Sequence, residues 1–507
     1  MLTKSEPDEI QDYLSDASHV SGGYAASVLF PETAAEVAAA LAGATRDQTP
    51  LTISGAGTGT VSGRVPFGGS ILATDRLNTI KSIEGDSHGG HAIVEAGTRL
   101  IDIQRAVELQ GLIYPPDPTE RTCFIGGNIS TNASGARTFK YGPTRNYVNG
   151  LQVALTTGDV ISLRRGELRA GTHQIQIPLA GGRTITAQLP SYQMPQVRKH
   201  ASGYYVAPGM DAIDLFIGSE GTLGVIVEAE LKLIPGPEGL LSGVVFFAAE
   251  ANLLAFVRDV RERSLQHRLP SGDDSPAAQS KVDARALEYL DIESLRFLRQ
   301  KYPSIPDEAV GAIFFEQETS PATEDELMTE WLSLLEKHQA LADGSWFATN
   351  EQDQAQLREF RHALPVLMNE WFSGHHQKKV STDMAVPDDQ FAGMLRFYQE
   401  HLRGGDLRCT IFGHIGDNHV HVNILPRNDD EAQRAWVIYR KFIRRAIDVG
   451  GTISAEHGIG KLKREYLREM YGERHLREMV ALKRAFDPQG ILGRGNMFDE
   501  QLLEESR

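Results

Sequence analysis

Histidines concentrate in one short segment downstream of residue 410. The run Gly413-His-Ile-Gly-Asp-Asn-His-Val-His421 holds three imidazoles beside an aspartate, and histidine is the commonest metal ligand at neutral pH. Apolar residues alternate in its flanks, which predicts a strand or a turn that enters one. In a regular strand His419 and His421 point to the same face, so His414 must reach that face from the turn.

A carboxylate and a further histidine lie in a second segment bounded by glycines. In Gly450-Gly-Thr-Ile-Ser-Ala-Glu-His-Gly-Ile-Gly460, a predicted helix stops at the paired glycines and Glu456 and His457 occupy a tight turn. Either segment alone is more often polar surface or hydrogen-bonded core. Together they predict a divalent metal site, because two histidines and one carboxylate form a common ligand set.

A third segment has the composition of a phosphate-binding loop. Thr33 and Glu36 form a capping box that predicts a helix start. Later in the chain, the predicted strand Leu51-Thr-Ile-Ser54 is followed directly by the loop Gly-Ala-Gly-Thr-Gly59. A Rossmann site needs GxGxxG at the start of a helix, whereas Pro66 and the glycine spacing argue against one here. The amides of such a loop can still bind phosphates, although a turn explains any single glycine equally well.

Composition limits the class of protein and its partners. A chain of 507 residues with 41% hydrophobic content is long enough for two or three domains. Its formal charge of −16 argues against a nucleic-acid partner, and its two cysteines argue against a disulfide framework. The basic run Lys461-Leu-Lys-Arg-Glu-Tyr-Leu-Arg-Glu469 is interpreted as a solvated helix face. No signal peptide or apolar span is visible, so we expect a cytoplasmic protein.

Strand and turn patterns suggest three parts. Residues 215–235 end in the alternation of a half-buried strand, and Pro235-Gly-Pro237 closes that unit. We therefore expect a first domain over residues 1–236, a second domain over 237–425, and a mainly helical segment over 426–507. The polar loop 270–276 falls within the second domain.

Four motifs in this order resemble the FAD-linked oxidases of the vanillyl-alcohol oxidase superfamily, which have a PCMH-type FAD-binding domain. They are Ser54-Gly-Ala-Gly-Thr-Gly-Thr60, Pro116-Asp-Pro-Thr-Glu-Arg-Thr-Cys-Phe-Ile-Gly-Gly-Asn-Ile-Ser-Thr-Asn-Ala-Ser-Gly135, Gly218-Ser-Glu-Gly-Thr-Leu-Gly-Val225 and the histidine and Glu-His pair. The similarity is greatest to the D-lactate, D-2-hydroxyglutarate and glycolate dehydrogenase branch. It implies an α+β fold: an FAD-binding domain of two α+β subdomains, a cap domain with an antiparallel sheet, and a helical C-terminal segment.

The resemblance implies FAD as the cofactor. Some relatives attach the flavin to a histidine beside the glycine loop, but residues 51–66 contain no histidine or cysteine, so we expect non-covalent binding. The expected FAD-binding residues are Ser54, Gly55, Ala56, Gly57, Thr58, Gly59, Pro116, Gly127, Asn128, Asn132, Ser134, Gly135, Gly224, Val225 and Ile226.

The resemblance also implies a metal-assisted oxidation. His414, His421 and Glu456 would bind zinc or manganese, and His457 would take the hydroxyl proton of a D-2-hydroxy acid while hydride passes to flavin N5. The branch usually has Gly-His-x-Gly-Asp-Gly-Asn-x-His, whereas this chain has Asn418 and His419 where glycine and asparagine are usual.

Two further residues are expected at the substrate. Asn423 would contact it beside the metal, and Arg361 would pair with its carboxylate through bidentate guanidinium geometry. Arg361 lies in a segment with a helical pattern, so a surface arginine explains it equally well.

Two other functions stay open at this stage. One is an alcohol, alditol or ether-lipid enzyme of the same superfamily, whose sites generally lack the paired histidines and the Glu-His motif. The other is a flavin-binding subunit of a larger glycolate-oxidase-like complex. The chain lacks the cysteine sets of an iron-sulfur domain, so the expected electron acceptor is a quinone, an electron-transfer flavoprotein, a cytochrome or oxygen. A homodimer, or a partner that holds the chain at the inner membrane, would also be compatible.

Overall fold

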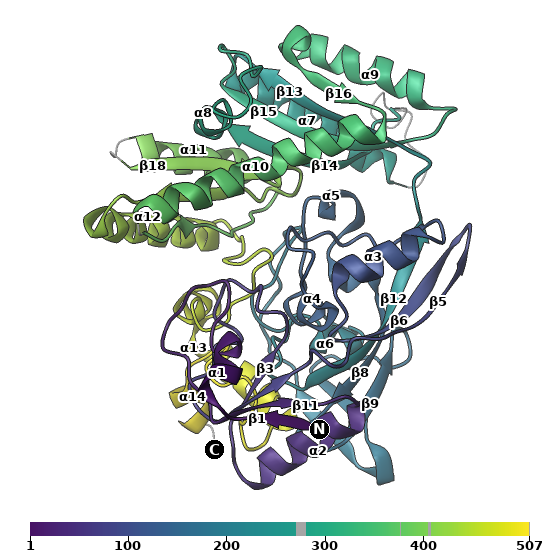
Figure 1. The fold of residues 1–507 in the computed structure, drawn as a ribbon, viewed down its shortest axis with the longest axis vertical. Helices are drawn as coiled ribbons and strands as arrows, with labels where there is room; N and C mark the ends of the chain where they lie inside the picture. Colours follow the sequence, from purple (N-terminus) through teal and green to yellow (C-terminus); the bar gives the residue numbers. More distant parts are fainter. Residues whose placement is uncertain (270–279, 376, 404–406, 506–507) are drawn as a thin grey trace.

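The computed structural model describes residues 1–269, 280–375, 377–403 and 407–505. The expected polar loop 270–276 therefore lies outside the described residues. Figure 1 shows two bodies: one sheet with its covering helices at the top, and the remaining sheets with both chain ends below. Among the described residues, no helix has both the length and the apolar character needed to cross a membrane.

A four-stranded sheet positions the glycine loop. Its order is β1 (Leu2–Lys4), β2 (Ser27–Phe30), β4 (Ser70–Ala73) and β3 (Leu51–Ser54), with the last three parallel. Helix α2 (Ala34–Arg46) begins where predicted, because the Thr33 side chain accepts a hydrogen bond from the Glu36 amide. The predicted strand before the loop is confirmed as β3, and no helix directly follows it.

A second, antiparallel sheet forms the other part of the lower body. Strand β12 (Val225–Pro235) lies between β6 (Gly89–Glu95) and β8 (Val148–Ala154), with β5 (Ile80–Asp86) and β9 (Val160–Arg164) at the edges and β7 (Leu112–Ile113) beside β12. The half-buried strand expected before Pro235 is thus confirmed. Other elements of this body are α1 (Pro7–Ile10), α3 (Leu100–Glu108), α4 (Ile125–Thr131), α5 (Thr138–Tyr141), α6 (Ile213–Phe216), β10 (Gln174–Pro178) and β11 (Thr184–Gln188).

The upper body contains an antiparallel sheet of seven strands. Its order is β16 (Trp346–Ala348), β13 (Gly239–Phe247), β15 (Gly311–Thr319), β14 (Ala284–Asp291), β18 (Arg408–Gly413), β19 (His421–Leu425) and β17 (Val380–Ser381). Its helices are α7 (Glu250–His267), α8 (Ile292–Leu298), α9 (Glu324–Lys337), α10 (Glu351–His375) and α11 (Phe391–Arg403). Trp331 of α9 stacks on Phe315 of β15 with ring centroids 3.8 Å apart, which anchors that helix to the sheet.

The C-terminal helices join both bodies. Helix α12 (Asp429–Asp448) contacts α11 and β17 of the upper body, whereas α13 (Arg464–Phe486) contacts β11 of the lower one and α14 (Glu500–Glu505) packs on α13. The chain between α12 and α13 therefore passes from one body to the other (Figure 1). The α+β class and the helical C-terminal segment agree with the expectation, while the domain boundaries stay a prediction.

Candidate active site

The glycine loop lines a cavity in the lower body. Residues after β3 meet the first turn of α4 and the start of β12 around this cavity. The expected FAD-binding residues that line it are Gly55, Ala56, Gly57, Thr58, Gly59, Gly127, Asn128, Gly224, Val225 and Ile226. The strand-to-loop transition thus brings a glycine-rich backbone to the lining of this cavity, and such a backbone can bind phosphates.

The glycines of this cavity leave room for a ligand. At Gly59 and Gly127 a Cβ atom would have no protein atom within 4 Å, so the space beside their backbone is open. Gly57 has φ +78°, and a Cβ there would lie 2.4 Å from the Arg64 guanidinium carbon. Arg64 in turn donates to the Gly55 carbonyl at 2.8 Å and to Ser54 Oγ at 3.1 Å. The arginine, which also lines the cavity, therefore fixes the conformation of the loop.

Five expected FAD-binding residues, Ser54, Pro116, Asn132, Ser134 and Gly135, are absent from the described cavity lining. Ser54 is buried under Arg64, the Pro116 carbonyl accepts from Gln104, and Asn132 ends α4 at φ +49°. Ser134 and Gly135 instead contact the group around Glu456, as described below.

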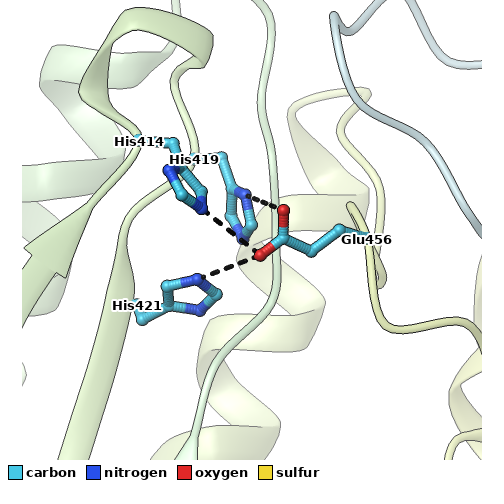
Figure 2. Close-up of side chains that lie close together, drawn as sticks. All are labelled: His414, His419, His421 and Glu456. Atoms are coloured by element: carbon cyan, nitrogen blue, oxygen red, sulfur yellow. Dashed lines mark ion pairs between the residues drawn. The ribbon is translucent and has the colours of Figure 1, made fainter. Parts of the chain in front are cut away.

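The three histidines of the 413–421 segment gather around Glu456 (Figure 2). Strand β18 ends at Gly413, His414 precedes the short 3-10 turn η5 (Ile415–Asp417), and β19 begins at His421. Glu456 Oε1 lies 3.3 Å from His414 Nε2 and 3.4 Å from His421 Nε2. The predicted turn into a strand is confirmed, and it brings all three imidazoles to one place.

Outer contacts orient two of these imidazoles. His414 Nδ1 lies 2.6 Å from Glu288 Oε1, and His421 Nδ1 donates to the Thr382 carbonyl at 2.8 Å. The Nε2 atoms of both rings consequently face Glu456. Burial raises the pKa of the Glu288 carboxyl, but the opposite charges of His414 and Arg361 outweigh this effect and lower the pKa to about 2. Burial also opposes a charged His414, yet the neighbouring carboxylates raise its pKa to about 9, so this cluster attracts positive charge.

His419 is the most buried member of the cluster, with no exposed side-chain surface. Its Nε2 lies 3.3 Å from Asp383 Oδ1 and its Nδ1 lies 4.0 Å from Glu456 Oε2, but neither contact has hydrogen-bond geometry. Burial lowers the pKa of His419 to about 3, which keeps the ring neutral. The metal ligands expected from the sequence did not include this histidine, although its position two residues before His421 was the available signal.

Glu456 Oε2 is held from the opposite side by groups from the lower body. Lys199 Nζ, which is fully buried, lies 3.2 Å from Glu456 Oε2 and donates to the Gly135 carbonyl at 2.8 Å. Ser134 Oγ donates to the same carboxylate oxygen at 3.2 Å. These contacts leave Glu456 Oε1 directed toward the imidazoles.

His457 connects the histidine cluster with the glycine-lined cavity. Its ring stacks on His421 with centroids 5.6 Å apart and an interplanar angle of 16°, and it also lines the cavity. His457 Nδ1 lies 3.4 Å from Asp383 Oδ2, and its amide donates to the same oxygen at 3.1 Å. Burial lowers the pKa of His457 to about 4 against the opposing carboxylates, so the ring is neutral at pH 7 and can accept a proton.

Asp383 is a buried carboxylate that also pairs with Lys463. Lys463 Nζ donates to Asp383 Oδ2 at 2.7 Å, and only 9% of the Lys463 side chain is exposed. The interpretation of residues 461–469 as a solvated helix face is therefore wrong at its start. Lys461 and Lys463 precede α13, and Lys461 Nζ contacts Asn496 Oδ1 at 2.9 Å.

The two residues expected at the substrate both lie beside the histidine cluster. Asn423 is buried on β19, and its side chain donates to the His421 carbonyl at 3.3 Å. Arg361 of α10 lies 3.3 Å from Glu288 Oε2, and 17% of its side chain is exposed. Arg361 thus adjoins the cluster through Glu288, which contradicts the alternative of a surface arginine.

Comparison with known proteins identifies the family. Residues 25–164 match the family described as FAD binding domain, and residues 275–497 match FAD linked oxidases, C-terminal domain. Glycolate oxidase subunit GlcD of Bacillus subtilis is 30% identical over 98% of this chain and 96% of its own length. The chain belongs to the FAD-linked oxidases. The expected FAD cofactor and the oxidoreductase class are thereby confirmed.

Other FAD-linked oxidases similar to this chain carry related names. D-lactate dehydrogenase of Anaerostipes hadrus is 30% identical over 97% of this chain and 93% of its own length. D-2-hydroxyglutarate dehydrogenase of Xanthomonas citri pv. viticola is 27% identical over 98% and 94%. A solved alkyldihydroxyacetonephosphate synthase matches 97% of this chain and 81% of its own, with a TM-score of 0.65 at 14% identity. That last similarity concerns the fold alone.

Proposed function

We propose that this FAD-linked oxidase converts a D-2-hydroxy acid to its 2-oxo acid with the assistance of a divalent metal. The observation that carries the proposal is the position of His457. This one side chain lines the glycine-rich cavity and also stacks on His421 of the histidine cluster. A substrate bound at the cluster would therefore have its C2 atom close to a flavin bound in the cavity.

The cavity suits FAD bound without a covalent link. The amides of Gly55 to Gly59 would hold the pyrophosphate, and the open space beside Gly127 would admit a flat ring. Asn128 and the segment Gly224 to Ile226 would line the remainder. When bound, FAD supplies the hydride-accepting chemistry of the reaction.

The cluster suits a divalent metal held by His414, His421 and Glu456. Donor atoms about 2.1 Å from a shared metal and about 100–110° apart lie about 3.2–3.4 Å from each other. The two Glu456 to histidine distances of 3.3 and 3.4 Å fit this spacing, and imidazole with carboxylate suits zinc or manganese. When bound, the metal would polarise the 2-hydroxyl and the carboxylate of the substrate.

The protein side chains would then orient the acid and receive its proton. His457 is neutral and would accept the hydroxyl proton, while Asp383 holds its ring and its amide in place. Asn423 lies on the same strand face as His421, two residues away, where it would contact the substrate. Arg361 would share its guanidinium between Glu288 and the substrate carboxylate.

The names of the relatives support this substrate class. They include a glycolate oxidase subunit, a D-lactate dehydrogenase and a D-2-hydroxyglutarate dehydrogenase. These three acids share a 2-hydroxy carboxylate group, which is the part of the substrate that the cluster would bind. Reduced flavin would be reoxidised by a separate acceptor: a quinone, an electron-transfer flavoprotein or a cytochrome.

The test is anaerobic bleaching of the bound flavin by a panel of D- and L-2-hydroxy acids and alditols. This assay needs no electron acceptor. The proposal predicts bleaching by at least one D-acid and none by its L-enantiomer. Bleaching by an alditol alone, or by no 2-hydroxy acid with FAD fully bound, would contradict it.

A further inference from the structure

A third imidazole, that of His419, lies in the cluster and has no role in the proposed function. We infer that His419 is a fourth protein ligand, which changes the site to three histidines and one glutamate. The inference rests on the metal site of the proposed function and extends it by one donor.

The position of the ring supports this role. Its centroid lies 4.5 Å from that of His421 and 5.3 Å from that of His414. One donor atom from each of His414, His419, His421 and Glu456 can be chosen so that all four lie within 4.8 Å of one another. Figure 2 shows the three rings arranged around the Glu456 carboxylate.

The surroundings of His419 leave one ring nitrogen for an ion. Nε2 faces Asp383 Oδ1 at 3.3 Å, so Nε2 would carry the ring proton and Nδ1, on the Glu456 side, would present a lone pair. Neither nitrogen makes a hydrogen bond, although the side chain is completely buried. An unsatisfied buried polar atom is unfavourable, and coordination of a metal by Nδ1 would satisfy that nitrogen.

A purely structural contact with Asp383 explains His419 less well. Asp383 already accepts from Lys463 Nζ at 2.7 Å and from Ser454 Oγ at 2.6 Å, and the Glu456 and His457 amides donate to it as well. The carboxylate is thus satisfied without the imidazole. His419 lacks a hydrogen bond even though a carboxylate lies beside it.

A fourth ligand has a consequence for the choice of metal. Zinc bound by four protein ligands in tetrahedral geometry has no position left for a substrate. A six-coordinate ion such as Mn²⁺ would keep two positions, enough for the hydroxyl and the carboxylate of a 2-hydroxy acid. The chain should therefore be active with Mn²⁺ or Co²⁺ and inactive when loaded with Zn²⁺, and His419→Asn should restore activity with Zn²⁺.

The experiment counts imidazole ligands by X-ray absorption at the metal edge in FAD-containing protein loaded with Mn²⁺ or Zn²⁺. The wild type should show three imidazoles and His419→Asn two, and His419→Gln provides a second variant should the first fail to fold. His338→Asn is the matched control, because His338 is mostly buried beside Asp259 at 2.9 Å, outside the cluster. It should retain three.

The outcomes separate this inference from the proposed function. Two imidazoles in the wild type, or equal flavin reduction with Zn²⁺ and Mn²⁺, would overturn the fourth ligand and leave the oxidation proposal standing. Three imidazoles together with no flavin reduction by any 2-hydroxy acid would support the ligand and overturn the oxidation. Failure of the wild type to bind either metal would overturn both the ligand and the metal assistance.

Discussion

Glu288→Gln removes a charge that supports the proposed metal site without removing a ligand. Glu288 is 5% exposed on β14, and its Oε1 lies 2.6 Å from His414 Nδ1. A carboxylate at this distance forms a charge-assisted hydrogen bond that raises the basicity of the imidazole. Loss of such an outer partner typically lowers metal affinity 10- to 100-fold, which corresponds to about 1.4–2.7 kcal/mol. We expect this loss in Glu288→Gln.

The assay is competition for the metal between the protein and a chromogenic chelator, with bound FAD measured on the same sample. Glu316→Gln is the matched control, because Glu316 is 4% exposed on the adjacent strand β15 and pairs with Arg285 at 2.9 Å. Both variants break a buried ion pair and should lower the melting temperature. Only Glu288→Gln should weaken metal binding. Wild-type affinity in Glu288→Gln, or an equal loss in Glu316→Gln, would refute the reasoning.

Three further changes test other parts of the site. His457→Gln should slow anaerobic flavin reduction about 100- to 10,000-fold by removing the proton acceptor; an unchanged rate in a stopped-flow measurement, at full FAD occupancy, would assign the proton to another group. Gly127→Val should place its side chain in the cavity and reduce the flavin absorbance of the purified protein. The control Gly393→Val, in α11 with equally open surroundings, should retain FAD. Equal FAD content in the two variants would contradict the assignment of the cavity to FAD. Burial lowers the pKa of His200 from 6.5 to about 3, so between these pH values the unfolded chain binds a proton that the folded chain does not, and the free energy of unfolding should fall as the pH drops from 6.5 to 3. Urea titrations over this pH range should show a smaller fall in the free energy of unfolding for His200→Gln than for the wild type. An equal fall in both proteins would disprove the contribution of His200.

Local patterns predicted the parts of the site that are made from adjacent residues. The capping box at Thr33, the strand before Gly55 and the turn around His414 all depend on neighbours in the sequence. The two glycine-bounded segments predicted a shared site only when taken together, because two histidines and one carboxylate form a common metal ligand set. The family resemblance then supplied the roles of individual residues.

The outer contacts could not be predicted in the same way. Glu288, Asp383 and Lys199 reach the cluster from β14, from the residues after β17 and from a loop of the lower body. None of the three belongs to a local pattern, so only the tertiary fold reveals them. For Lys463 the local pattern was misleading. Its alternating charged neighbours predicted a solvent-exposed side chain, whereas its ammonium group pairs with buried Asp383.

The most direct test of the central claim is single-turnover flavin reduction in one protein preparation carried through three states: with its metal, after removal of the metal, and after its return. The acid is the D-2-hydroxy acid found active in the anaerobic panel. The account predicts rapid bleaching, its loss, and its recovery, with FAD bound throughout. Bleaching at the same rate in the metal-free state would contradict the claim that the histidine cluster and the flavin cavity form one metal-assisted active site.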